Sequence, residues 1–383
     1  MARKADDIPD ATLRLLITTG VGPTTHARLR RHFGSDEAVV AAGAGELARI
    51  RRLGPGSADA LRRALDEADT ACERRRMAEC DTGLIVRGDS DYPALLDAIP
   101  DPPPALWIRG HLEPTDRLAV AIVGARRCTA YGREQAGRFA SLLAECGLTI
   151  VSGGAIGIDG EAHRGALRAG ARTIAVMGCG LGVVYPPQHR ELFERLVDAG
   201  SAMVSEYPMA TAPRPAHFPH RNRIISGLSV GVLVIEAARR SGALITARRA
   251  VEEHGREAMA LPGRVDSPAS AGCLAAIREG WAGLVTSHAD VLSQLDSSSH
   301  LLRGALEAAG HADATRKATL FDTNLTGAQR TIVQTLRNAD EPLVVDQIAA
   351  RSGLPLSRIL AELTLLEIRG HVRNDRAGIR LKT

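Results

Sequence analysis

The chain has 383 residues, of which 45% are hydrophobic and 24% are charged, and its formal net charge is only +4. This length suits two or three domains, and the globular composition excludes wholesale disorder. No apolar run approaches the roughly 20 residues that cross a bilayer, and Asp6 and Asp7 interrupt the N-terminus. We therefore expect a cytoplasmic protein without a membrane segment.

The basic residues are strongly uneven in type. Of the 48, only Lys4, Lys317 and Lys382 are lysines, and the others are arginines. A genome that favours arginine codons explains this bias, and so does phosphate binding, because a guanidinium presents a fixed fork of donors. Without a central lysine, an ATPase-type phosphate loop or a Schiff-base lysine is excluded there. The six cysteines show no C-x-x-C spacing, which argues against zinc and disulfide frameworks.

Residues 1–80 predict a small all-α domain. Two glycine turns, Gly20–Pro23 and Leu53–Gly56, each separate two helical patterns, as in paired helix-hairpin-helix units. In that motif the turn and the following helix offer backbone N–H groups to DNA phosphates without reading bases. An ordinary helical bundle with glycine caps is the alternative.

Residues 84–295 predict a Rossmann-like domain that begins with a Pro-rich connector over 84–114. Strands are predicted at 118–123, 148–151, 173–177, 202–205, 231–235 and 257–261. Near-continuous apolar strands that alternate with helices indicate a parallel sheet covered on both faces. Ligands of such sheets bind beyond the carboxyl ends of the strands.

Small residues follow four of these strands, at Gly124–Arg127, Ser152–Gly157, Gly178–Gly182 and Ser241–Ala243. Glycines let a backbone approach an anion closely, and helix N-termini supply the donors. Four such turns on one edge of a sheet predict a phosphate-binding edge.

Catalytic alternatives find less support. Asp159 and His163 are spaced to share a metal on one helix, but no third ligand accompanies them, so a capping Asp and a packed His are preferred. Glu206 and Glu236 both follow strands and are candidates for paired acids. No G-x-S-x-G elbow occurs, and Arg126 would crowd the pyrophosphate of a dinucleotide site. We predict phosphate binding with no metal, no cofactor and no catalytic machinery.

Residues 296–325 are predicted to be a linker, and 326–383 a winged helix with helices at Gly327–Asn338, Val345–Ser352 and Leu356–Arg369 before a hairpin. Glu362 and Glu367 on the third helix disfavour major-groove reading. Protein contact, or weak duplex binding through arginines of the wing, is favoured instead.

The ordered motifs over roughly 84–290 resemble the DNA-processing protein A (DprA/Smf) family. They are Ile122–Arg126, Ser152–Asp159, Gly178–Leu181 with Tyr185-Pro186, Ser205–Pro208, Arg221–Ser229, Glu236-Ala237, Ser241–Ala247 and Pro262-Gly263. The flanks resemble that family's sterile-alpha-motif-like N-terminal domain and its winged-helix C-terminal domain.

The resemblance implies a single-stranded DNA-binding protein and not an enzyme. Such a protein has an extended Rossmann-like domain that dimerises, protects incoming DNA in natural transformation and loads the RecA recombinase onto it. The implied DNA-phosphate site consists of Gly124, Arg126, Ser152, Gly153, Gly154, Gly178, Gly180, Arg221, Arg223, Ser241, Gly242 and Thr246. Phe218 either stacks on a base or anchors its loop. Arg221 and Arg223 either line the edge or hold the 209–220 loop through hydrogen bonds.

Two positions depart from the family pattern. Leu274 stands where the family often has Asn, so no binding role is assigned there, and His189 replaces another Asn but can keep a donor. The rival function is a nucleotide-processing enzyme of the phosphoribohydrolase type, but Arg249 and Ala250 stand where its catalytic Glu is needed. A winged-helix regulator with a sensing domain is disfavoured by the acids on the third helix.

Overall fold

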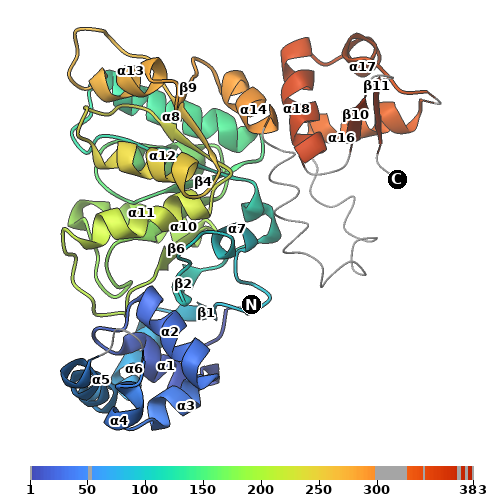
Figure 1. The fold of residues 1–383 in the computed structure, drawn as a ribbon. Coiled ribbons are helices and arrows are strands. Elements are labelled where there is room, and N and C mark those ends of the chain that lie inside the picture. Colours follow the sequence, from blue (N-terminus) through green and yellow to red (C-terminus); the bar gives the residue numbers. More distant parts are fainter. Residues whose placement is uncertain are drawn as a thin grey trace.

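The computed structural model describes residues 2–50, 54–297, 326–339, 341–368, 372–375 and 378–381. Figure 1 shows a helical bundle at the N-terminus, a central sheet flanked by helices, and a small winged helix at the C-terminus. The predicted fold class, α/β with a largely parallel sheet covered on both faces and a C-terminal winged helix, is confirmed. Within the described residues, every helix is too short or too polar to traverse a lipid bilayer.

Short helices build the N-terminal part. They are α1 (Asp10–Ile17), α2 (Pro23–Phe33), α3 (Asp36–Ala41), α4 (Ala44–Leu47), α5 (Pro55–Glu67) and α6 (Thr70–Glu79). Gly22 and Gly54 are the N-cap residues of α2 and α5, and a proline follows each. Proline suits this first helical position because its missing N–H has no helical partner there. The core between the helices includes the fully buried Leu15, Leu29, Leu47 and Leu65.

The central sheet has nine strands in the order β1-β2-β6-β5-β4-β3-β7-β8-β9. They are β1 (Thr82–Val86), β2 (Ala105–Gly110), β3 (Ala119–Val123), β4 (Thr149–Ser152), β5 (Thr173–Met177), β6 (Ala202–Ser205), β7 (Gly231–Val234), β8 (Glu257–Ala260) and β9 (Gly283–Leu284). β2 is antiparallel to β1 and β6, and the other neighbours are parallel. Each of the six predicted strands appears within a residue of its expected bounds. β1, β2 and β9 are additions, and the first two show that the Pro-rich connector widens the sheet.

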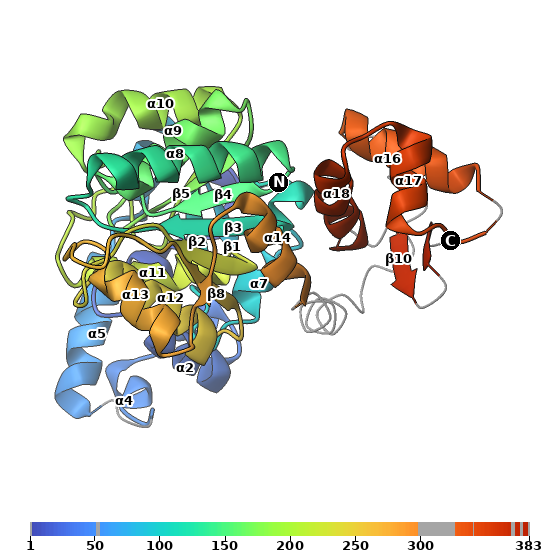
Figure 2. The ribbon, with the colours of Figure 1, turned by 90° about the horizontal axis from the view of Figure 1, so that it is seen from above.

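Helices cover both faces of the sheet, as Figure 2 shows. One face carries α8 (Ala130–Glu145), α9 (Ile158–Arg168) and α10 (Arg190–Asp198), and the other carries α11 (His217–Gly227), α12 (Gly242–Glu252) and α13 (Ala271–Arg278). Alternate residues of β3 serve the two faces: Val120 and Ile122 pack with Phe139 of α8, whereas Ala121 and Val123 lie in the same core as Ile224 of α11. Two further helices, α7 (Ala94–Asp97) and α14 (His288–Ser297), close the sheet domain.

The strand order reverses at β3. From β3 the chain builds β4, β5 and β6 on one side, then crosses to β7 on the other side and continues to β8 and β9. β3 and β7 are parallel neighbours, with Val123 opposite Val234. Such a reversal is where doubly wound sheets hold their ligands, beyond the carboxyl ends of the strands. We call this edge, formed by loops 124–129, 153–157, 178–186 and 235–241, the carboxyl edge.

The C-terminal unit has the helix order of a winged helix: α16 (Gly327–Arg337), α17 (Val345–Ser352), α18 (Leu356–Ile368), β10 (Val372–Asp375) and β11 (Gly378–Leu381). Its third helix, α18, lies beside α14 (Figure 1). Ala361 and Leu365 belong to the same buried cluster as Leu292 and Leu295 of α14. This packing occupies part of the helix that reads a groove in DNA-binding winged helices. Most of the predicted linker, residues 298–325, lies outside the described residues.

Candidate nucleic-acid interface

Four exposed arginines lie on the two loops that flank the strand reversal. Arg126 and Arg127 follow β3, and Arg239 and Arg240 follow β7. The Ala125 N–H donates to the Glu236 carbonyl at 2.8 Å, which ties the two loops together. None of the four arginines forms an ion pair with any carboxylate that the structure describes. Exposed positive charges without carboxylate partners, on two loops joined by a hydrogen bond, favour the binding of an anion.

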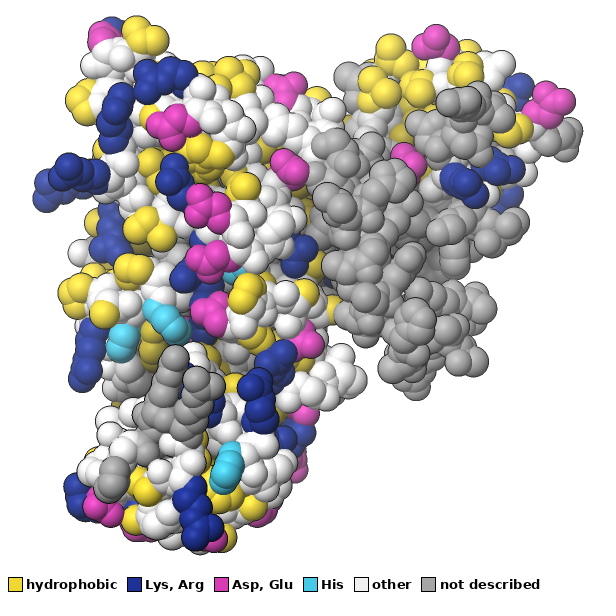
Figure 3. Space-filling model, viewed as in Figure 1, with side chains coloured by type: hydrophobic (Ala, Val, Ile, Leu, Met, Phe, Trp, Pro, Cys, Tyr) yellow, Lys and Arg dark blue, Asp and Glu magenta, His cyan; other side chains and the backbone are white. Residues whose placement is uncertain are grey.

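Figure 3 shows Lys and Arg side chains gathered along the left margin of the sheet domain, the side on which α12 begins in Figure 1. Of the arginines at the reversal, the sequence singled out only Arg126. The signal for the others was an Arg-Arg pair after each of two buried strands. That β3 and β7 are neighbours becomes visible only with the strand order.

The Arg126 guanidinium rests on an aromatic ring. Its Cζ lies 4.9 Å from the centroid of Phe218, in a cation–π contact, and Tyr185 lies beside the same ring at 5.6 Å between centroids. Phe218 is half-buried and packs on Gly178, where a Cβ would lie 2.8 Å from its Cδ1. The contact with an exposed guanidinium is worth about 0.5–1 kcal/mol and limits the conformations of the arginine. Phe218 therefore positions Arg126 at the carboxyl edge.

Arg221 is buried directly beneath the loop after β4. Only 3% of it is exposed, and its Nη1 donates to the Gly153 carbonyl at 2.7 Å and to the Val176 carbonyl. Asp159 lies on the other side of Gly153 and accepts the Gly153 N–H at 3.1 Å. Burial raises the pKa of Asp159 to about 6 and lowers that of Arg221 to about 10. Arg221 thus places an internal positive charge below the carboxyl edge, and its Nη1 group donates to backbone carbonyls of the protein.

Arg223 is completely buried and neutralised by carboxylates. Its Nη1 and Nη2 donate to Glu206 at 3.1 and 2.6 Å, and its Nε donates to Asp101 at 3.0 Å. Burial by itself would raise the pKa of Glu206, but the hydrogen bond from His220 and the charge of Arg223 hold it below its usual value. Arg223 joins α11 to the end of β6 and to the connector, which is the structural role that the sequence left open.

The three predicted hydroxyl donors occupy different environments. Ser152 is buried and donates to the Ile122 carbonyl at 2.6 Å, and Thr246 is buried and donates to the Gly242 carbonyl at 3.3 Å. Both hydroxyls are therefore used inside the protein and not at its surface. Ser241 caps α12 by accepting the Ala243 N–H at 3.3 Å, and Gly242 is exposed with nothing within 4 Å of its Cβ position. The start of α12 is the accessible part of this segment.

The predicted glycines are packed against other protein atoms. A Cβ on Gly124 would lie 2.5 Å from Ile158, one on Gly153 would lie 2.6 Å from Arg221, and one on Gly180 would lie 2.1 Å from the Pro208 carbonyl oxygen. Gly154 adopts a φ of +65°, which side chains other than glycine rarely allow. These glycines permit the loops of the carboxyl edge to pack closely on the layers beneath them.

The acids and the histidine considered for catalysis are held in separate hydrogen-bond networks. Glu236 accepts the N–H and the hydroxyl of Thr129, at 2.7 and 2.8 Å. His163 is fully buried with its Nδ1 at 2.7 Å from the Thr173 hydroxyl, and burial lowers its pKa to about 3. A packed, neutral histidine fits these contacts, as the sequence favoured.

A groove of about 870 Å³ separates the N-terminal helices from the sheet domain. The turn Gly20–Pro23 lines one wall, and Tyr207, Arg214 and His217 line the other. Charges of both signs face it, because Glu67, Asp69 and Arg76 also contribute. The first glycine turn therefore lies next to the sheet domain, although the groove lacks the uniform charge of the carboxyl edge.

Two sequence families match this chain. The family described as DNA recombination-mediator protein A matches residues 83–296, which is more than half of the chain, and the DprA winged helix domain matches 316–378. The chain belongs to the DNA recombination-mediator protein A family. A role in DNA processing follows from this membership.

Relatives and solved structures agree with this assignment. The chain is 40% identical to Protein Smf of Escherichia coli over 75% of its own length and 74% of that protein. It is 35% identical to Protein Smf of Synechocystis over 93% and 94% of the two chains. The X-ray structure of DNA processing protein A from Streptococcus pneumoniae matches with a TM-score of 0.64 and 35% identity, over 75% of this chain and 98% of that one. DNA processing protein A from Helicobacter pylori, whose structure concerns a single-stranded DNA binding mode, matches with a TM-score of 0.50 and 28% identity, over 58% and 96%.

The structure shows the surroundings of the two residues that depart from the DprA pattern, His189 and Leu274. His189 is buried, and its Nδ1 lies 3.0 Å from the Gly154 carbonyl, so it supports the loop after β4 from below. Leu274 is half-buried on α13. His189 thus keeps a polar contact under the carboxyl edge of this DprA-family protein.

Proposed function

We propose that the protein binds single-stranded DNA along the carboxyl edge of its sheet and mediates recombination on that strand. The observation that carries this proposal is the set of four exposed arginines without carboxylate partners among the described residues, on the loops after β3 and β7. Phosphates that bind arginines release condensed counter-ions, which supplies most of the affinity for a nucleic acid backbone. The single-stranded DNA binding mode of the Helicobacter pylori relative supports the choice of ligand.

The phosphate path would run from Arg126 and Arg127 past Arg239 and Arg240 to the exposed start of α12. There Ser241 is the N-cap and Gly242 the first residue of α12, whose free N–H groups favour an anion. Arg221 would contribute its charge from beneath, and the glycines of the carboxyl edge would let the loops lie close to the strand. Phe218 would hold Arg126 over its ring, and its exposed part is the place for a stacked base.

Binding is tested by fluorescence anisotropy with a labelled oligonucleotide at several salt concentrations. We expect single strands to bind more tightly than duplex, and Arg126→Ala to weaken binding more than tenfold, equivalent to about 1.4 kcal/mol. Removing one phosphate contact should also reduce the slope of log K against log salt by about 0.7. Arg195→Ala is the matched control, because Arg195 is also exposed but lies in the last turn of α10. Equal affinity of wild type and Arg126→Ala would refute the site.

The wider role that we propose is that of the DNA processing proteins in natural transformation. The protein would protect the incoming strand and load the RecA recombinase onto it. It would dimerise through the sheet domain and work in the cytoplasm without catalysis. The engagement of Asp159, Glu206 and Glu236 with protein donors supports a binding function over a hydrolytic one. RecA filament assembly on strands coated with single-strand-binding protein should accelerate when the protein is added. Release of base or phosphate from nucleotides by the purified protein would favour the phosphoribohydrolase alternative.

A further inference from the structure

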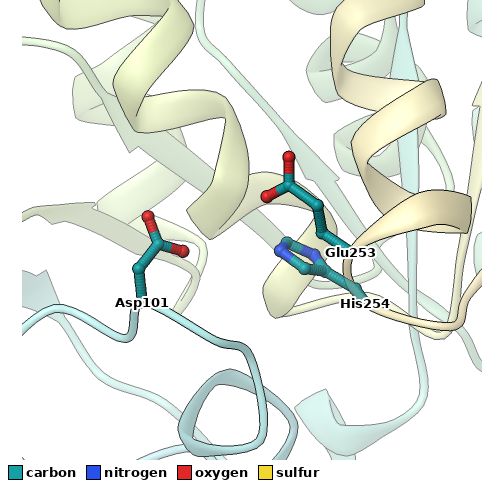
Figure 4. A group of neighbouring side chains, drawn as sticks. All are labelled: Asp101, Glu253 and His254. Atoms are coloured by element: carbon teal, nitrogen blue, oxygen red, sulfur yellow. The ribbon is translucent and has the colours of Figure 1, made fainter.

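Three potential metal ligands converge on the side of the sheet domain away from the DNA site. Asp101 lies in the Pro-rich connector, and Glu253 and His254 follow directly on the last turn of α12. One ligand atom from each lies within 4.8 Å of the other two. Figure 4 shows the Asp101 carboxylate and the His254 ring directed toward each other, with the Glu253 carboxylate beside them. Because α12 begins at the carboxyl edge, its last turn lies at the opposite edge of the sheet.

Two atoms of this cluster are buried without a partner in the described structure. They are Oδ1 of Asp101 and Nε2 of His254. A buried polar atom without a hydrogen bond is unfavourable by about 1–3 kcal/mol, so a group that is not part of the chain is expected between them.

The hydrogen bonds around His254 define which of its nitrogens is free to coordinate. Its Nδ1 lies 3.0 Å from the Ser226 hydroxyl, and that hydroxyl donates to the carbonyls of Asn222 and Arg223, each at 3.3 Å. In the tautomer in which the Ser226 oxygen accepts the Nδ1 proton, with the hydroxyl hydrogen given to a carbonyl, a lone pair remains on Nε2. Metal-binding histidines use this arrangement, in which the second ring nitrogen donates to a neighbouring group. A lone pair on Nε2 opposite a carboxylate oxygen calls for a cation.

In each of the two carboxylates, one oxygen is paired with a neighbouring arginine. Arg223 donates to Oδ2 of Asp101 at 3.0 Å, and Oδ1 is the unpartnered atom. Arg249 pairs with Oε2 of Glu253 at 2.9 Å. Arg256 is also buried nearby and donates to the Leu95 carbonyl at 3.2 Å. The cluster offers one nitrogen and two carboxylates, each with an arginine on one oxygen, which disfavours Mg²⁺ and Ca²⁺, ions that prefer several oxygens.

We propose that Asp101, Glu253 and His254 form a binding site for one divalent transition-metal ion of the Zn²⁺ type. One imidazole nitrogen and two carboxylate oxygens are ligands that Zn²⁺ accepts, with water in the fourth position. Tetrahedral zinc with bonds of about 2.0–2.2 Å holds its ligands about 3.4 Å apart, which is compatible with ligand atoms that all lie within 4.8 Å of one another. Glu253 is exposed, and its ion pair with Arg249 leaves Oε1 as the oxygen for the metal. The ion would tie the connector, and with it β1 and β2, to the end of α12.

The site is tested on the full chain with ZnCl₂ and, separately, MgCl₂. Equilibrium dialysis gives the number of zinc ions retained per chain, and thermal unfolding followed by tryptophan fluorescence gives the stabilisation. Glu253→Gln is the main variant, because its exposed side chain can be changed without disturbing the core, and His254→Asn is the second. Glu252→Gln is the matched control, since Glu252 is the neighbouring exposed acid on α12 and lies outside the cluster. Comparing variants also accounts for zinc bound by the half-buried thiols.

We expect the wild type and Glu252→Gln to retain one zinc ion more than Glu253→Gln and His254→Asn. At a hundredfold excess over Kd, zinc should raise the melting temperature of the first two by roughly 5 °C or more, and that of the variants much less. Affinity for single-stranded DNA should be equal in all four, because the cluster contains none of the four exposed arginines of the proposed DNA site. Equal zinc retention by all four proteins would overturn the proposal and leave a water molecule between Asp101 and His254. Stabilisation by MgCl₂ alone would overturn the transition-metal assignment.

Discussion

Replacing Arg223 by alanine separates the two roles that the sequence allowed for this residue. Arg223 is completely buried and makes three hydrogen bonds, two to Glu206 and one to Asp101. Its removal would leave the buried Glu206 carboxylate with the hydrogen bond to His220, at 3.0 Å, as its remaining side-chain contact. Breaking a buried ion pair by deleting one partner typically destabilises a protein by about 3–5 kcal/mol. We expect a loss of that size in the free energy of unfolding of the sheet domain.

The assay is urea unfolding followed by tryptophan fluorescence. Both tryptophans of the chain, Trp107 and Trp281, lie in the sheet domain, so the signal reports that domain and not the winged helix. Arg264→Ala serves as the control, because Arg264 also pairs with an acid, Asp266 at 2.8 Å, but is 82% exposed; we expect no measurable change. Single-stranded DNA affinity of the folded Arg223→Ala fraction should stay within about threefold of wild type. A variant that keeps its stability but loses DNA affinity would refute the structural role.

Three further outcomes are expected. Phe218→Leu retains an apolar side chain but removes the cation–π contact with Arg126, so single-stranded DNA affinity should fall about two- to fivefold at unchanged stability; no change would mean that Phe218 does not position Arg126. Gly153→Ala should destabilise by about 1–3 kcal/mol, since its Cβ would lie 2.6 Å from Arg221, whereas Gly242→Ala, which meets open space, should be neutral in urea unfolding. Burial lowers the pKa of His163 to about 3, so the folded state keeps the ring neutral and stability is lost as pH falls below about 6.5. Unfolding measured between pH 7 and pH 4 should show this loss, roughly 3 kcal/mol, and His163→Asn should flatten it.

The parallel strands and the winged helix could be predicted from sequence because both leave periodic apolar patterns. The six predicted strands are buried along their whole length, except for half-buried Glu257 at the start of β8. β1 and β2 were harder to predict because prolines surround them and their partners are not adjacent in the sequence. β2 pairs with β6, nearly a hundred residues later, and apolar periodicity carries no information on such pairing.

Some residues of the candidate site could likewise be predicted from the sequence, and others could not. Arg126 could be identified from its position after a buried strand, and the structure leaves it exposed. The buried environment of Arg223 could not be predicted from the sequence, because its partner Asp101 is 122 residues away and arginines are rarely buried. The pairing of Arg126-Arg127 with Arg239-Arg240 depends on β3 and β7 being neighbours, which only the strand order reveals.

The scarcity of lysine has a physical consequence for the interior of the sheet domain. Burial lowers the pKa of Arg221 to about 10, so the side chain still carries its charge at neutral pH. A lysine starts from a lower pKa, about 10.4, so the same burial would bring it closer to neutral pH, where a change of environment can discharge it. The charged form attracts Asp159, while Nη1 donates to the Gly153 and Val176 carbonyls. Arginine thus suits both populations found here: the buried cations that hold the loops, and the exposed ones that we propose bind phosphate through a bidentate fork.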